Sequence, residues 1–238
     1  IANPIYDVVF KYLMEDTEIA RRLLSKITGE DIIEISVEPQ EFAGRSDKFE
    51  VIILRLDFKA TIKTKEGKRK KVLIELQKGK NPADIMRFRK YLGDNYRKED
   101  TSEKDKKKKE ALPIITIYFL GFRLANVITS IMKVNREYID LITDKKIEVK
   151  EEFVEKLTHD SFIIQIPRLK KKVRNEIERV LKVFNQSYVT EGDKKTLEFS
   201  EKDFENDELL QLIASRLRKA ATEEELLRKI EIEEEVEN

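Results

Sequence analysis

The chain has 238 residues, of which 40% are hydrophobic and 40% charged, with one histidine (His159) and no cysteine. This composition supports a hydrophobic core and excludes a wholly disordered chain, and the absence of cysteine excludes disulfides, thiolate zinc sites and a cysteine nucleophile. Residues 223–238 carry a net charge of −6, which leaves +7 on the preceding residues. A basic body with an acidic tail is compatible with nucleic-acid binding.

Membrane insertion and secretion are not indicated by the sequence. The longest apolar run, at 114–122, has nine residues, whereas a spanning helix needs roughly 20. The first residues carry no signal-peptide pattern. We therefore expect a cytoplasmic protein that does not contact a membrane.

The N-terminal quarter predicts two helices and a strand. Asn3 followed by Pro4 is typical of a helix start, because Asn caps the helix and Pro fits its first turn. A second helix is expected over about 16–27, ended by Gly29. The alternation over 32–37 predicts a short strand.

A β-hairpin follows. Residues 51–62 alternate as a strand, and the segment 65–67, which ends in glycine, suits a three-residue loop. That loop pairs Thr64 with Lys68 and fixes the register of the returning strand. A two-residue loop would shift the register by one position and move every side chain to the other face.

In the three-residue register, Asp57 lies opposite Glu75. Directly opposed side chains have Cβ atoms roughly 4.5–5.5 Å apart, and two carboxylates at that separation repel each other unless a cation or proton intervenes. Mg²⁺ prefers such oxygen ligands. The hairpin therefore predicts a metal site, with Lys59 and Gln77 beside it. The alternative is an ordinary hairpin with one buried and one solvated face.

The rest of the chain predicts helices and strands in alternation. A helix is expected at about 82–96, followed by a solvated, lysine-rich loop at 97–110. Strands are expected at 114–120, 138–142 and 162–166, and helices at about 169–184, 207–220 and from 223 onward.

These features together resemble a known family. Asp57, the Glu75-Leu76-Gln77 triplet eighteen residues later, and a helix that carries Arg87 and Tyr91 resemble the PD-(D/E)XK nuclease superfamily. The order of the flanking blocks is similar to the bacterial branch of PD-(D/E)XK family transposases, which are related to recombination-promoting nucleases. Those blocks are 3–11, 56–58, 74–77, 87–91, 117–122 and 157–167.

The resemblance implies an α/β protein with a restriction-endonuclease-like core, a mixed central sheet flanked by helices, and a mostly helical C-terminal extension. Residues 1–125 would form the core, 126–199 would add strands and a helix, and 200–238 would form the extension. The implied activity is Mg²⁺-dependent hydrolysis of phosphodiester bonds in DNA, with Mn²⁺ as a substitute. The alternative is a non-catalytic protein of the same fold that binds DNA or a protein, and a homodimer is allowed for.

The resemblance also assigns roles to residues. Asp57 and Glu75 would hold Mg²⁺ with help from the Leu76 carbonyl, and Asp7 is a third candidate ligand. Gln77 stands where many members have Lys and cannot carry charge, so Lys59 is a candidate for the cationic role.

Several candidates have an equally simple structural interpretation. Arg87 and Tyr91 either contact phosphate or support Glu75, and Asp7 either joins the metal or forms a surface ion pair with Lys11. His159 is expected to be structural despite its neighbours Asp160 and Ser161. Two lysine groups are candidate DNA contacts or solvated surface: Lys106, Lys107, Lys108 and Lys109 in the loop, and Lys170 and Lys171 at the later helix.

Overall fold

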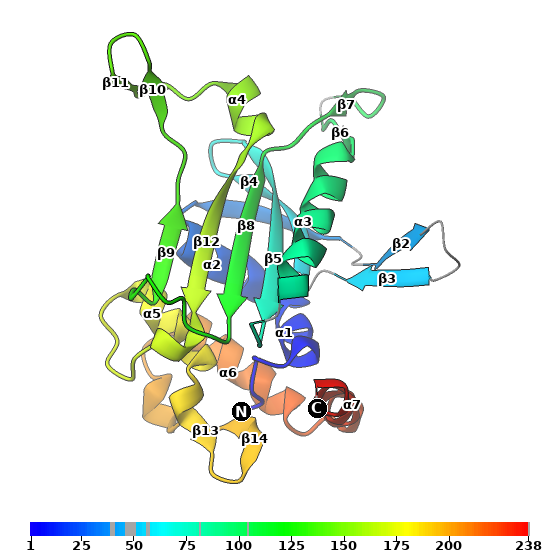
Figure 1. Ribbon diagram of the computed structural model, residues 1–238. Helices are drawn as coiled ribbons and strands as arrows, with labels where there is room; N and C mark the ends of the chain where they lie inside the picture. Colours follow the sequence, from blue (N-terminus) through cyan, green and yellow to red (C-terminus); the bar gives the residue numbers. More distant parts are fainter. Residues whose placement is uncertain (39–40, 46–50, 56–57, 81, 104, 238) are drawn as a thin grey trace.

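The computed structural model describes residues 1–38, 41–45, 51–55, 58–80, 82–103 and 105–237. A six-stranded mixed sheet forms its centre (Figure 1). The strand order is β1 (Ile32–Val37), β4 (Phe58–Thr64), β5 (Arg69–Gln77), β8 (Ile114–Leu120), β12 (His159–Gln165) and β9 (Ile131–Val134). Strands β1, β4 and β5 are antiparallel, β5, β8 and β12 are parallel, and β9 is antiparallel to β12. The expected α/β architecture with a mixed central sheet is confirmed.

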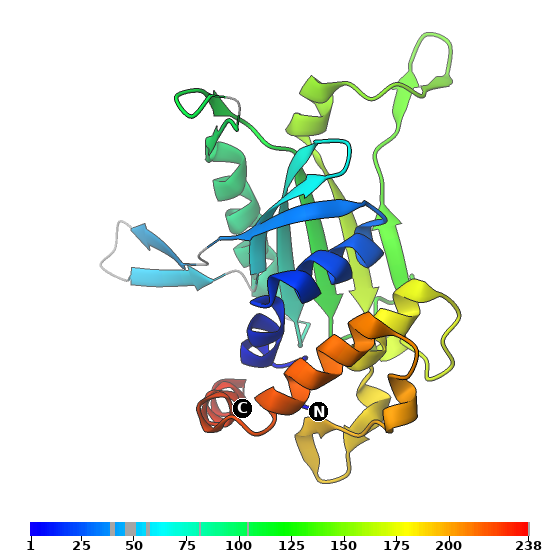
Figure 2. The same ribbon diagram turned by 180° about the vertical axis from the view of Figure 1, so that it is seen from behind.

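Helices flank both faces of this sheet. Helices α1 (Asp7–Met14), α2 (Thr17–Thr28) and α6 (Glu208–Ala220) cover the rear face, as seen in Figure 2. Helix α3 (Pro82–Arg97) connects β5 to the parallel strand β8 and crosses the front face. A parallel pair needs such a crossover connection.

The alternation of β5 divides the core into two parts. Val72, Ile74 and Leu76 point into the main core beneath the rear helices. Leu73 points to the front face, where it packs with a small cluster on α3 and β8: Phe88, Tyr91 and Ile114. Because successive side chains of a strand alternate between faces, Arg69, Lys71 and Glu75 of β5 also lie on the front face, whereas Lys70 points to the other face.

Smaller elements complete the described part of the chain. The described residues form four two-stranded sheets: β2 (Glu41–Arg45) with β3 (Val51–Arg55), β6 (Asp100–Thr101) with β7 (Lys109–Glu110), β10 (Tyr138–Asp140) with β11 (Lys145–Ile147), and β13 (Val189–Thr190) with β14 (Asp193–Leu197). Short helices are α4 (Glu152–Leu157) and α5 (Glu176–Leu181).

Three expectations from the sequence are wrong in their bounds. The predicted strand 51–62 is divided between β3 and β4, which belong to different sheets. The predicted loop 97–110 contains the β6–β7 hairpin, and Arg69 ties it to β5 by an ion pair with Glu110 at 2.7 Å. The predicted helix 169–184 begins only at α5, because the Asn175 side chain caps it by accepting a hydrogen bond from Glu178 N.

The first helix also differs from the prediction. Asn3 is not its cap: the Asn3 amide nitrogen donates to Lys194 O at 2.9 Å, and α1 starts at Asp7. The second helix agrees with the prediction. Asp16 caps α2, and Gly29 ends it with φ of +74°, a backbone angle that favours glycine.

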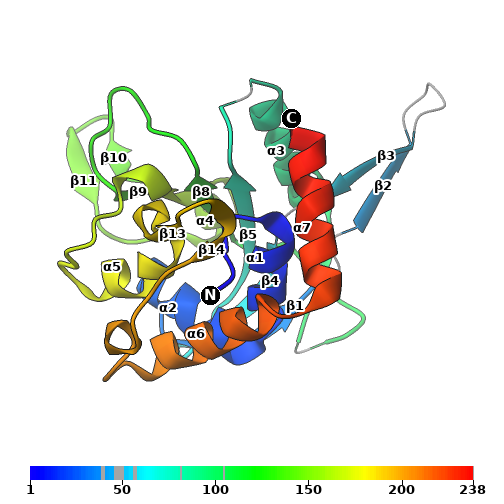
Figure 3. The ribbon, with the colours of Figure 1, turned by 90° about the horizontal axis from the view of Figure 1, so that it is seen from below.

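The C-terminal helices pack on the body of the same chain. Figure 3 shows α6 and α7 (Glu224–Glu237) alongside α1. Leu209, Ile213 and Leu217 of α6 and Ile230 of α7 are fully buried in the main core. Removal of residues 200–238 would therefore expose the core. In the described part of the chain, no helix is both long and apolar enough to cross a bilayer.

Gly121, directly after β8, packs so closely against the end of β5 that only glycine fits there. Gly121 N donates to Gln77 O at 2.8 Å, and a Cβ added at Gly121 would lie 2.4 Å from the Lys78 carbonyl oxygen. That contact is with backbone, which cannot swing away. The sequence 75–78 is thus held against β8 by close backbone approach.

We predict that Gly121→Ala lowers the free energy of unfolding by about 1–3 kcal/mol, because the added methyl group overpacks this junction. The matched control is Gly93→Ala in α3, where an added Cβ meets nothing within 4 Å. In a helix interior, that change stabilises by about 0.5–1 kcal/mol. Urea denaturation of the three proteins measures both effects, and an equal stability of both variants would contradict the assignment.

Candidate active site

The hairpin that carries the predicted site has the predicted register. Thr64 N donates to Lys68 O at 2.9 Å, and Gly67 takes the left-handed conformation with φ of +76°. The pairing continues to Phe58 opposite Ile74. Asp57, the first predicted metal ligand, and Leu56 lie outside the described residues, so the opposition of Asp57 and Glu75 stays a prediction.

Glu75 is a buried carboxylate on the front face of β5. Its side chain is 2% exposed, and Arg87 Nη2 from α3 donates to its Oε1 at 2.6 Å. A buried carboxylate needs a countercharge or bound cation to offset its desolvation. Of the two roles considered for Arg87, support of Glu75 is the one that this contact provides, and the guanidinium still reaches solvent with 42% exposure.

Tyr118 of β8 lies beside Glu75 in the parallel ladder. Burial raises the pKa of the Tyr118 phenol well above its ordinary value, and the negative charge of Glu75 raises it further. Its ring also packs on Phe88 of α3 at 4.5 Å between centroids. Tyr118 is therefore a neutral hydroxyl group beside the carboxylate throughout the physiological pH range.

Lys59 of β4 is almost completely buried, with 1% exposure, and forms an ion pair with Glu38 at 2.8 Å. Thr61 Oγ1 also donates to Glu38, at 2.9 Å. Burial lowers the pKa of Lys59, although Glu38 partly compensates. Burial acts to raise the pKa of Glu38, but the hydrogen bond and charge of Lys59, together with the Thr61 hydroxyl and the charge of Lys98, outweigh burial and hold that pKa below its ordinary value. The sequence predicted that Lys59 lies on the same face as Glu75, which is confirmed, but it did not predict Glu38 as the partner of Lys59.

The front face contains a second buried lysine. Lys71 of β5 is 1% exposed and pairs with Asp100 of β6 at 2.9 Å. Three charged side chains, Lys59, Lys71 and Glu75, are thus buried on two adjacent strands, each with an oppositely charged partner from outside the hairpin. Pairing makes these burials tolerable, since an uncompensated buried charge is strongly destabilising.

Gln77 and Leu76 complete the predicted triplet. Gln77 is half-buried on the front face, and Leu76 is buried in the main core on the other face. The backbone of Gln77 is fixed by the bond from Gly121 described above. The triplet therefore presents a carboxylate and an amide side chain on the front face, and Arg87 of α3 contacts the carboxylate.

Asp7 lies at the start of α1 and forms an ion pair with Lys11 at 2.5 Å. This contact is the structural alternative that the sequence predicts for Asp7. Its second oxygen, Oδ1, is buried without a hydrogen-bond partner among the described residues. The N-terminus of α1 is capped from the far end of the chain, where Glu233 of α7 accepts from Asp7 N at 2.9 Å. Glu233 also pairs with Lys78, directly after the predicted triplet.

This junction was not predicted. Tyr6 OH donates to Glu234 at 2.5 Å, and the Lys78 ammonium lies 4.2 Å from the Tyr6 ring centroid. Glu233 and Glu234 are separated from Tyr6 and Lys78 by more than 150 positions. No local pattern reveals such contacts, since an acidic tail is equally typical of a solvated helix.

The candidate DNA contacts occupy different places. Tyr91 is 1% exposed and belongs to the small apolar cluster under α3. Four lysines are exposed in the β6–β7 hairpin, next to the starting end of β5: Lys106, Lys107, Lys108 and Lys109. Two follow the carboxyl end of β12, and one of them lies 5.0 Å from the Tyr188 ring centroid: Lys170 and Lys171. Glu75 lies near the carboxyl end of β5. The lysines of the β6–β7 hairpin, at the starting end of that strand, are therefore farther from Glu75 along the strand direction than the pair that follows β12.

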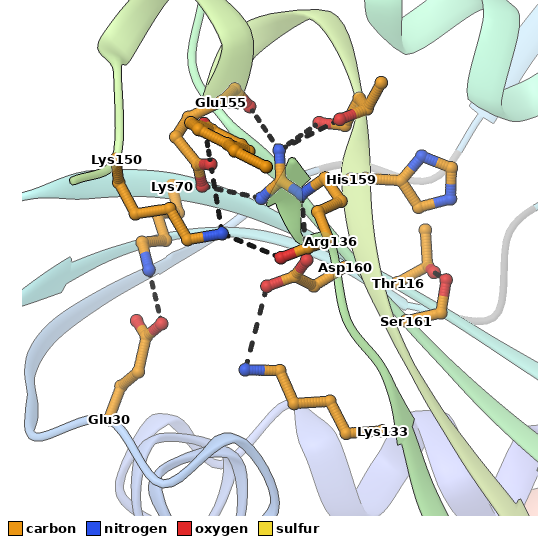
Figure 4. Close-up of polar contacts among 12 residues, drawn as sticks. Glu30, Lys70, Thr116, Lys133, Arg136, Lys150, Glu155, His159, Asp160 and Ser161 are labelled. Carbon is orange, nitrogen blue, oxygen red and sulfur yellow. Dashed lines mark hydrogen bonds and ion pairs between the residues drawn. The ribbon is translucent and has the colours of Figure 1, made fainter. Parts of the chain in front are cut away.

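The triplet of His159, Asp160 and Ser161 does not form a catalytic triad. His159 Nδ1 shares a hydrogen bond with Tyr96 OH at 2.8 Å, and Ser161 Oγ accepts from Thr116 at 2.8 Å. Asp160 accepts from Arg136 at 2.9 Å (Figure 4). Burial lowers the pKa of His159, and the Arg136 charge adds to this. The expected structural histidine agrees with these contacts.

Comparisons with known proteins add no relative. No protein-family model, curated protein or solved structure matches the chain. Among the described residues, no three histidine or carboxylate side chains gather closely enough to hold a metal ion by themselves. The predicted ligand set includes Asp57, which lies outside that part of the chain.

We predict that Glu38→Gln lowers the free energy of unfolding by about 3 kcal/mol at pH 7, because Lys59 is left buried without its countercharge. Since the fold lowers the pKa of Glu38, its contribution is present above the ordinary value of 4.5 and is lost at lower pH. The difference between the two proteins should therefore shrink in acid.

The control is Glu34→Gln, which removes an exposed carboxylate 3.9 Å from Lys63 and should cost less than about 0.5 kcal/mol. Denaturant titration at neutral and acidic pH measures both variants. Equal effects of the two substitutions would show that the Lys59–Glu38 pair does not hold the hairpin.

Proposed function

We propose that this chain is a metal-dependent nuclease of the PD-(D/E)XK kind, with its active site on the front face of the β4–β5 hairpin. The observation that carries the proposal is Glu75: a buried carboxylate near the end of a central strand, oriented by an arginine that also reaches solvent. The hairpin register that places Asp57 opposite Glu75 in the sequence pattern is supported over 58–63.

The donor chemistry fits a hard divalent cation. Carboxylate, amide and carbonyl oxygens are the ligands that Mg²⁺ takes in proteins, usually with several waters. Glu75, Asp57 and the Leu76 carbonyl would hold the ion, whereas Asp7 lies on α1 at the rear face and is paired with Lys11. A bound divalent cation would lower the pKa of an attacking water and neutralise charge on the scissile phosphate.

The protein groups around this position would orient the reacting phosphodiester. Arg87 fixes the Glu75 carboxylate and is exposed enough to meet a phosphate oxygen. Lys59 adds a buried positive charge on the adjacent strand, which supports the proposal that it replaces the lysine absent at Gln77. Gln77 can donate or accept a hydrogen bond without changing the local charge.

DNA is the proposed substrate. Arg89, Lys90 and Arg97 line the exposed side of α3, and the lysine-rich β6–β7 turn continues this positive charge. Cationic side chains bind the phosphate backbone without sequence preference. A non-catalytic DNA-binding protein of the same fold would share this surface. Only a measurement of DNA cleavage therefore distinguishes a nuclease from such a binding protein.

The test is plasmid cleavage with Mg²⁺, Mn²⁺ or EDTA. We expect cleavage by the wild type that EDTA abolishes, and a loss of about a hundredfold or more in Glu75→Gln and in Asp57→Asn, since each removes a charged ligand. The matched control is Glu66→Gln, the same change in the exposed loop of the same hairpin, which should cleave as the wild type does.

Thermal denaturation with and without Mg²⁺ separates lost chemistry from lost folding. Mg²⁺ should raise the melting temperature of the wild type and of Glu66→Gln, and much less that of the two site variants. Cleavage that survives Glu75→Gln, or a wild type that neither cleaves DNA nor responds to Mg²⁺, would overturn the proposal in favour of the non-catalytic alternative.

A further inference from the structure

The second half of helix α7 differs from the first half in charge and burial. Leu226 and Ile230 anchor the first half in the main core, with 7% and 0% exposure. Residues 231–237 then contain five glutamates and no basic residue. Among the described side chains of 231–235, none is buried. We call residues 231–237 the acidic strap.

Glu233 is the main attachment of the strap to the body. Its carboxylate accepts hydrogen bonds from the backbone amides of Asp7 at 2.9 Å and Val8 at 3.4 Å, at the start of α1. The same carboxylate pairs with the Lys78 ammonium, and its side chain is only 16% exposed. One carboxylate thus receives two backbone donors and a lysine.

Glu234 and Glu231 add further attachments. Glu234 accepts from the Tyr6 hydroxyl at 2.5 Å and lies 3.8 Å from the Lys195 ammonium of β14. Glu231 lies 3.3 Å from the same lysine. Each of these contacts joins a carboxylate of the strap to a positive group or a hydrogen-bond donor of the body.

The strap is a poor helix by itself. The C-terminal end of a helix carries a partial negative charge, which acidic side chains in the last turn oppose. The last turn of α7 has no basic residue, and glutamates four positions apart repel each other. The helical form of the strap therefore depends on the positive groups of the body, and another anion that binds those groups would release it.

The groups beneath the strap have the chemistry of a phosphate site. A helix N-terminus binds anions through its backbone amides and its dipole, and lysine is a common phosphate ligand. Here the start of α1 and Lys78 already hold an anion, the Glu233 carboxylate. The strap therefore takes the place that a phosphate group would fit.

The position of these groups connects them to the proposed active site. Lys78 follows Gln77 directly and lies three residues after Glu75, a separation of about 10 Å along a strand. Figures 1 and 3 show α7 beneath the carboxyl end of β5, running from α6 at the rear toward the front. Each strand of duplex DNA carries a phosphate about every 3.4 Å along the axis, so DNA bound at Glu75 would extend to Lys78.

We propose that the acidic strap is an autoinhibitory substitute for the DNA backbone. Glu233 and Glu234 occupy the phosphate position at Lys78 and the start of α1, and DNA must displace them to bind there. This inference rests on the proposed function, since it assigns a regulation to that site. A strap that is docked most of the time lowers the apparent affinity for DNA in proportion to the fraction of undocked molecules.

Fluorescence anisotropy of a short labelled DNA duplex in EDTA measures binding of the full chain without cleavage. We expect Glu233→Gln/Glu234→Gln to bind the duplex about tenfold more tightly than the wild type. The control Glu224→Gln/Glu225→Gln makes the same charge change in the first turn of α7. It should bind within about twofold of the wild type, because solvent and salt screen distant exposed charges.

A third substitution tests the phosphate position itself. Addition of Lys78→Gln to the Glu233→Gln/Glu234→Gln variant should remove the gain in affinity, because the released position binds phosphate through that lysine. Thermal denaturation verifies that each variant is folded. A strap variant that binds no more tightly than its control, or a gain that survives Lys78→Gln, would overturn the proposal.

Hydrogen exchange of the wild type tests displacement without any substitution. DNA should speed exchange of the backbone amides over 231–237 and leave those over 224–230 unchanged, since Leu226 and Ile230 stay in the core. Exchange over 231–237 that DNA leaves unchanged or slows would contradict the strap. A chain that cleaves DNA with an unmoved strap fails only this inference, whereas a chain that releases the strap on DNA without cleavage fails only the nuclease assignment.

Discussion

Burial of charge beneath helix α3 is the constraint on which the front face of the sheet depends. Glu75, Lys59 and Lys71 are inaccessible to water, and each is neutralised by a side chain from another element: Arg87, Glu38 and Asp100. A purely structural sheet would place apolar residues here at lower cost, since buried ion pairs rarely stabilise more than apolar packing. Retention of the Glu75 carboxylate near the end of β5 is what the proposed site for phosphate chemistry would require.

The same contacts position the rest of the molecule. Arg87 fixes α3 over β5, and Asp100 fixes the lysine-rich β6–β7 hairpin to the same strand. On the other face, Glu233 ties α7 to α1 and to Lys78. The C-terminal helices therefore belong to the fold that surrounds the proposed site.

Local chemistry made much of the fold predictable. Glycine-dependent turns set the hairpin register at Gly67 and the end of α2 at Gly29, and the apolar run over 114–120 matches β8. The partners of buried charges were not predictable, because Glu38, Asp100 and Glu233 are ordinary acidic residues in the sequence. The helix expected at 169–184 was too long because apolar spacing outweighed the capping signal of Asn175.

The central claim is that Glu75 binds a divalent cation, and anomalous X-ray diffraction from crystals soaked in Mn²⁺ tests it most directly. The account predicts an anomalous peak at ligand distance from the Glu75 carboxylate, roughly 2–2.5 Å as for other hard cations, and no such peak in Glu75→Gln crystals. A wild-type crystal that binds Mn²⁺ only elsewhere, or not at all, would contradict the account and leave Glu75 as the structural partner of Arg87.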